Sequence, residues 1–259
     1  MSRALFPGVG PWFVPPESFP DGMRVTVMAP HPDDFDAIGV TMRRLHEGGS
    51  VITLAVLTRG TSGVDNEYAA ARPGADKAGI REAEQLASCA FFGLPLDSVR
   101  FLRLEEDATG QLAEGGVNAR TVASVLDESR PELVFLPHGN DTNAAHRRTW
   151  AMVRDALSRL QSEATMLLNR DPKTVAMRED LYVVFGAEEA EWKRALLRHH
   201  DSQQFRNLRA RGTGFDERVL SGNRAVAEAE AVTRGRARGD PPGGAYAEVF
   251  EVVDAARRN

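Results

Sequence analysis

A histidine and three aspartates follow a short apolar run near the start of the chain. Residues 24–36 read RVTVMAPHPDDFD, in which Val25, Val27 and Met28 suit a buried parallel strand and Pro30 ends it. Open α/β sheets present their ligands at the carboxyl ends of such strands. The sequence therefore predicts a catalytic site at this position, and a metal-dependent enzyme in particular.

The spacing of these polar residues separates two metal ligands from a free carboxylate. His31 and Asp34 are three residues apart, so in a tight turn leading into a helix both can point at one ion, while Asp33 points elsewhere. A catalytic zinc site usually takes three protein ligands and keeps its remaining position for water. A third ligand must therefore come from another segment.

A second polar cluster follows the buried-strand run 133–136, which Pro137 closes. His146 in this cluster would open a helix over 147–161. It would lie beside the loop that carries His31 and Asp34 if the strands before the two clusters are neighbours in the sheet. We therefore select His146 as the third ligand. An N-cap at 33–34 with a surface histidine is the alternative, because Asp and Asn are common in capping turns. Two clusters that each end an apolar strand favour the metal site.

These residues also resemble a known family. APHPDD at 29–34 resembles the signature of the LmbE-like, or PIG-L, zinc-dependent N-deacetylases. Further family motifs follow in the same order: LTRGTSG at 57–63, IREAE at 80–84, KRALLRHHDSQ at 193–203 and AYAEVF at 245–250.

The resemblance implies a role for each residue of the two clusters. His31, Asp34 and His146 would hold Zn²⁺, with Fe²⁺ or another divalent ion as the alternative. Asp33 would be the general base that takes a proton from the attacking water. Asp141 would accept the second ring N–H of a ligating histidine and fix its tautomer.

The chain departs from the family at Asn143, where the family usually has a histidine that stabilises the oxyanion of the intermediate. The hypothesis is that the Asn143 amide still donates to the oxyanion, or that His138, on the same predicted loop, supplies the charge. The match also implies that Arg81 and His200 contact the substrate. A solvated arginine and a capping histidine are the alternatives.

Strands and helices alternate along the chain, which predicts right-handed crossovers and a Rossmann-like, three-layer α/β fold with a mostly parallel central sheet. We expect a single domain over 1–259, with a proline-rich arm at 1–22. The predicted elements are strands 24–29, 51–57, 99–103, 132–136 and 180–186, and helices 37–48, 77–92, 119–129, 146–162 and 188–207.

The arm carries Trp12, Phe13 and Phe19, which we expect to dock on the same domain or on a neighbouring subunit. It has no unbroken apolar run, so it predicts neither a signal peptide nor an integral membrane segment. Cys89 is the only cysteine, which excludes a disulfide within the chain and fits a reducing compartment. A cytoplasmic protein is therefore expected, and a homo-oligomer is left open.

The net charge of −5 provides no basic field for a nucleic acid, so a small-molecule substrate is expected. The predicted function is a zinc-dependent hydrolase that removes an N-acyl group, in the first place acetyl, from an amino sugar or glycoconjugate. Three alternatives stay open. They are a catalytically silent family member that binds a sugar or partner, a deacylase of a non-sugar amide, and a metal-independent Rossmann-like protein whose acidic loop is structural.

Overall fold

The computed structural model describes residues 11–14, 21–70, 76–108, 111–233 and 246–254. Its strands form one eight-stranded sheet in the order β1-β7-β8-β6-β5-β2-β3-β4. The strands are β1 (Trp12–Val14), β2 (Arg24–Ala29), β3 (Val51–Val56), β4 (Val99–Phe101), β5 (Leu133–Pro137), β6 (Thr165–Asn169), β7 (Leu181–Phe185) and β8 (Tyr246–Asp254).

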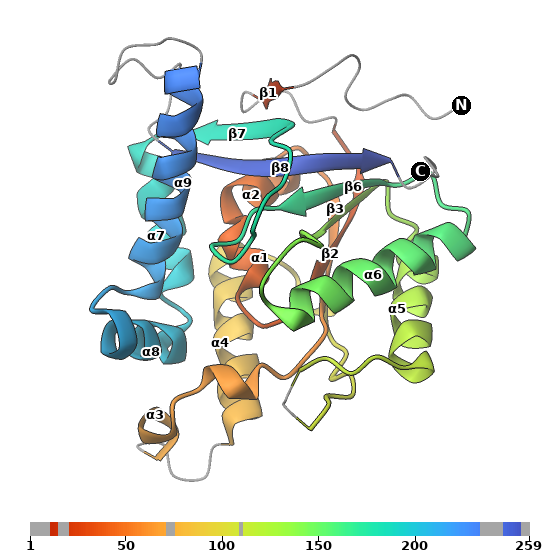
Figure 1. The fold of residues 1–259 in the computed structure, drawn as a ribbon, viewed down its shortest axis with the longest axis horizontal. Coiled ribbons are helices and arrows are strands. Elements are labelled where there is room, and N and C mark those ends of the chain that lie inside the picture. Colours follow the sequence, from red (N-terminus) through yellow and green to blue (C-terminus); the bar gives the residue numbers. More distant parts are fainter. Residues whose placement is uncertain (1–10, 15–20, 71–75, 109–110, 234–245, 255–259) are drawn as a thin grey trace.

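Helices flank this sheet (Figure 1). They are α1 (Asp34–Ala37), α2 (Gly39–Glu47), α3 (Asn66–Ala70), α4 (Lys77–Phe92), α5 (Gly116–Ser129), α6 (Ala144–Arg159), α7 (Ala187–Leu197), α8 (Asp201–Arg211) and α9 (Phe215–Thr233), with the 3₁₀ turns η1 (Thr61–Gly63) and η2 (Leu96–Ser98).

The sheet is buried on both faces, as the alternation of elements predicts. In β5, Leu133 and Phe135 pack into a cluster with residues of α2, α4 and α7, whereas Val134 and Leu136 pack with α5 and α6. Successive side chains of a strand point to opposite faces, so an unbroken apolar strand needs helices on both sides. Every strand pair is parallel except those of β8, which runs antiparallel to β6 and β7. The predicted mostly parallel three-layer α/β fold is confirmed.

The topology opens a crevice between β2 and β5. The chain runs from β2 through β3 to β4 on one side, and then returns to place β5 and β6 on the other side of β2. The loops that follow β2 and β5 therefore leave the sheet in opposite directions. Ligands of open α/β sheets bind at such a switch point, at the carboxyl ends of the strands.

Strand 24–29 and helix 77–92 have their predicted bounds, whereas the predicted continuous helix 188–207 is wrong. It is two helices, because α7 ends at Leu197 and α8 begins at Asp201. The break falls at His200, whose backbone (φ −88°, ψ 63°) is not helical and whose side chain is fully buried. Strand β6 and helix α9 were not predicted.

Residues 12–14 of the arm form β1, which pairs in parallel with β7 at the edge of the sheet. The Phe13 ring stacks on Tyr182 with 5.0 Å between the ring centroids. This part of the arm therefore docks on its own chain. Phe19 and most of the arm lie outside the described residues. Within the described part of the chain, no helix is both long and apolar enough to cross a bilayer.

Candidate active site

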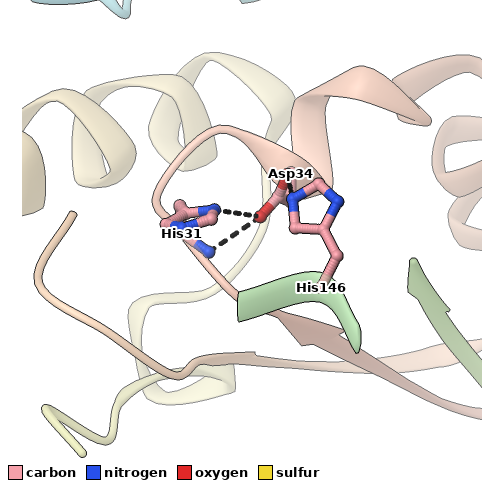
Figure 2. Close-up of side chains that lie close together, drawn as sticks. All are labelled: His31, Asp34 and His146. Carbon is pink, nitrogen blue, oxygen red and sulfur yellow. Dashed lines mark hydrogen bonds and ion pairs between the residues drawn. The ribbon is translucent and has the colours of Figure 1, made fainter. Parts of the chain in front are cut away.

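The three predicted metal ligands converge at the switch point. His31 and Asp34 come from the loop after β2 and the start of α1, and His146 comes from the first turn of α6. One ligand atom of each lies within 4.8 Å of those of the other two. Figure 2 shows the Asp34 carboxylate between the two imidazoles, whose ring centroids are 5.5 Å apart.

The electrostatics of this group favour a cation. Burial opposes ionisation of Asp34, but its hydrogen bonds with His31 and the nearby His146 ring outweigh burial and hold the pKa of Asp34 at about 2. Burial likewise opposes a charged His146 ring, but the hydrogen bond to Asp141 and the charge of Asp34 raise its pKa. Two imidazoles and a carboxylate are a donor set that suits zinc.

Asp141 orients the His146 ring. Its Oδ2 lies 3.1 Å from His146 Nδ1, and its other oxygen accepts the Asn143 backbone N–H at 2.6 Å. With the Nδ1 proton held by Asp141, the lone pair of His146 is on Nε2, which lies 3.9 Å from Asp34 Oδ1. This carboxylate and histidine arrangement is the one that usually fixes the tautomer of a metal-ligating histidine.

Asp33 lies beside the group without joining it. Its carboxylate forms an ion pair with Arg81 at 3.0 Å, and its backbone N–H donates to Gln85 at 2.9 Å. Burial raises the pKa of Asp33, with the Arg81 charge opposing it. A raised pKa brings a carboxylate closer to the range in which it both accepts and returns a proton near neutral pH. Asp33 also has a φ of 118°, in the left-handed region that favours glycine.

Arg81 of α4 lies against the loop after β2 that carries His31 and Asp33, and its side chain is almost fully buried. It donates to the backbone carbonyl of Pro32 and pairs with both Asp33 and Glu84. It also lines the cavity. Its hydrogen bonds hold the loop, so they give Arg81 a positioning role beside the predicted contact with substrate.

Asn143 caps helix α6. Its Oδ1 accepts the backbone N–H of Ala145 at 3.0 Å, as the N-cap residue of a helix does. The capping bond directs the amide oxygen toward the helix. The side-chain NH₂ group has no hydrogen-bond acceptor among the described residues. Asn143 lines the cavity next to Thr142 and Ala144.

His138 and His200 lie away from the described cavity lining, and their predicted contacts with substrate do not agree with this placement. His138 accepts the Asn140 N–H through Nδ1 and lies 3.2 Å from Glu251 through Nε2. His200 is fully buried, with Nε2 2.7 Å from Asp36 Oδ2. Each ring therefore lies within hydrogen-bonding distance of a carboxylate, Glu251 for His138 and Asp36 for His200.

The cavity lined by His31, Asp34 and His146 has a volume of about 960 Å³. It is formed by loops after β2, β3, β5 and β6, together with α8, α9 and the start of β8. Gly60 lies in the wall with a φ of 62°, and a Cβ there would be 2.9 Å from Pro32 Cδ. The glycine therefore permits a close approach of the loop after β3 to the loop after β2.

Asp171 is a site residue that the sequence did not reveal. It follows β6, lines the cavity, and places a carboxylate oxygen within 4.8 Å of ligand atoms of Asp141 and His146. Burial raises its pKa, while His146 opposes the shift. The signal was present, because residues 165–171 repeat the pattern of an apolar run followed by polar residues that marks the first loop.

The comparisons with known proteins agree with this arrangement. The PIG-L family, described as GlcNAc-PI de-N-acetylase, matches residues 26–157, which include His31, Asp34 and His146. The chain belongs to this family. No curated protein sequence matches it significantly.

Several solved structures share the fold. The N,N'-diacetylchitobiose deacetylase of Pyrococcus horikoshii has a TM-score of 0.68 and 18% identity, over 91% of this chain and 85% of that one. The zinc-inhibited form of teicoplanin deacetylase Orf2 has a TM-score of 0.63 and 14% identity, over 89% and 98%. GalB, the 4-carboxy-2-hydroxymuconate hydratase of Pseudomonas putida KT2440, has a TM-score of 0.69 and 17% identity, over 90% and 96%.

Proposed function

We propose that this chain is a metal-dependent hydrolase that removes an N-acyl group, in the first place acetyl, from an amino sugar or glycoconjugate. The observation that carries the proposal is the convergence of His31, Asp34 and His146. The carboxylate of Asp33 lies beside this group and pairs with Arg81. Membership of a deacetylase family and the likeness to two deacetylase structures support it.

His31, Asp34 and His146 would hold the ion, for which Zn²⁺ is the first candidate. When bound, the ion would supply the Lewis acid of an amide hydrolysis. Asp33 would take a proton from the attacking water and return it to the departing amine, as its raised pKa allows. The acyl carbon thus gains a bond to the water oxygen and loses its bond to nitrogen, which leaves a carboxylate and a free amine.

Asn143 would contribute to the same step through its side-chain NH₂. The carbonyl oxygen gains negative charge as water adds, and a donor already aimed at that position stabilises it. Arg81 would hold Asp33 in place, and Asp141 would keep the His146 ring in the tautomer that leaves Nε2 free.

The hydratase among the structural neighbours means that the fold alone does not define the reaction. The test is metal content by elemental analysis of protein purified without added metal, paired with acetate release from a panel of N-acetyl amino sugars. We expect about one zinc per chain and release that stops on chelation. Zinc without release from any N-acyl compound would contradict the hydrolase and favour the silent binding protein, and absence of metal would contradict the assigned ligands.

A further inference from the structure

Three arginines of α8 and α9 line the cavity that contains the metal group. They are Arg206 and Arg211 on α8 and Arg218 on α9. None of them forms an ion pair with a carboxylate anywhere in the described chain. Three cationic side chains therefore lie on one wall of the cavity without a structural counter-ion.

Neighbouring arginines behave differently. Arg209, on the same helix, pairs with Asp65 and Glu67 and does not belong to the described cavity lining. Arg198, just before α8, pairs with Asp216 at 2.8 Å. An arginine with a structural role in this region thus finds a carboxylate, whereas the three of the cavity wall do not.

The lack of a partner is clearest for Arg218. Its side chain is half-buried, its Nε is buried with no hydrogen-bond acceptor among the described residues, and its guanidinium lies 5.9 Å from the centre of the Phe215 ring. Burial lowers the pKa of Arg218, and the charges of Arg211 and Arg206 act in the same direction. A buried donor without an acceptor lowers stability, and so does a buried positive charge beside two others. An anion in the cavity would accept the hydrogen bond and offset the charge.

The acidic groups of the cavity do not neutralise this wall. Asp33 and Asp171 attract Arg218 from a distance, but neither forms an ion pair with it. Asp33 is already paired with Arg81, and Asp34 would be neutralised by the ion it binds. The cavity therefore has a metal end and a separate cationic wall.

We propose that Arg206, Arg211 and Arg218 form a subsite for an anionic group of the substrate, a phosphate or a carboxylate. Guanidinium groups present forks of N–H donors that match both oxyanions. The inference rests on the proposed function for the chemistry at the metal end. It narrows the substrate to an N-acylated amino sugar or conjugate that carries negative charge.

Calorimetric titration of the metal-loaded protein with inorganic phosphate, and separately with succinate, tests the subsite without turnover. The variants are R218Q and R211Q, and the matched control is R209Q. We expect at least one anion to bind and each subsite variant to weaken it by about tenfold, the loss of one charge-assisted hydrogen bond, while R209Q leaves it unchanged. The anion whose binding is weakened in R218Q and R211Q identifies the anionic group of the substrate as a phosphate or a carboxylate.

Equal binding by all variants would place the anion at the metal or elsewhere and would overturn the proposal, as would no binding of either anion. If R218Q fails to fold, R211Q decides, because Arg211 is exposed.

A second readout compares kcat/KM for acetate release from N-acetylglucosamine, N-acetylglucosamine 6-phosphate and N-acetylmuramic acid. We expect a charged sugar to be preferred and the preference to fall about tenfold in R218Q, mainly through KM. A preference unchanged in R218Q would overturn the subsite. Arginine-dependent anion binding without acetate release from any sugar would contradict the proposed hydrolysis and support the subsite.

Discussion

His200 Nε2 lies 2.7 Å from Asp36 Oδ2, and both side chains are fully buried. Asp36 belongs to α1, two residues after the proposed ligand Asp34, whereas His200 precedes α8. Gln85 and Ser88 of α4 also donate to Asp36 Oδ2. These contacts therefore hold the turn that carries His31 and Asp34 against α4 and the start of α8.

Replacing His200 with alanine should lower the free energy of unfolding by about 3 kcal/mol, because it opens a cavity and removes a partner from a buried carboxylate. Urea unfolding measures this. H199A is the matched control, since His199 is only half-buried and its ring packs at a tilt against Phe91. It should cost less than about 1 kcal/mol. Equal decreases in the free energy of unfolding of H200A and H199A would show that the buried His200–Asp36 pair adds no more stability than a half-buried histidine does.

Asp33→Asn should reduce acetate release by about 10²–10⁴-fold while the metal stays bound, because the amide cannot accept a proton. Asp34→Asn provides the contrast, since it removes the anionic ligand and should lower the metal content. Kinetics combined with elemental analysis separate the two cases. Retained turnover in Asp33→Asn would exclude Asp33 as the base.

Asn143→Ser separates two roles of this residue. Serine caps a helix about as well as asparagine, so α6 should keep its stability, but its short hydroxyl cannot replace the NH₂ donor. We expect acetate release to fall by up to about 10²-fold with little change in the free energy of unfolding. Asn143→Ala should lose rate and about 1 kcal/mol of stability together. A serine variant with normal activity would show that Asn143 acts only as a cap.

Cys89 should be unreactive in the folded protein. Burial, helped by the charge of Asp36, raises the pKa of its thiol from 9.0 to about 12. The neutral thiol is thus favoured by folding, and its stabilising effect is complete below about pH 9 and lost as the pH rises toward 12. Iodoacetamide at pH 8.5 should leave native protein unlabelled and label it fully in urea. Rapid labelling of the native state would show that this core opens readily.

Much of the architecture is predictable because strands such as β2 and β5 are mainly apolar runs followed by proline and a polar cluster. Those runs also locate His31, Asp34 and His146, since parallel strands deliver their loops to one edge of the sheet. Strand β6 has the same pattern, and overlooking it hid Asp171.

Other features depend on tertiary contacts that no local pattern reveals. Periodicity predicts one helix across His200, but the buried contact with Asp36 breaks it there. The family match implies that His200 contacts the substrate. Its ring is fully buried against Asp36 and does not belong to the described cavity lining. The sequence alone assigned no role to the arginines of α8 and α9, because only the path of the folded chain brings them to the cavity wall.

The left-handed backbone of Asp33 places the demands of folding and of chemistry in opposition. A residue with a side chain held at a φ of 118° costs about 1–3 kcal/mol that glycine would not. Selection for thermal robustness alone would thus replace this aspartate with glycine, which would remove the proposed base. The proposed role of Asp33 as the base would account for an aspartate at a position where glycine folds better.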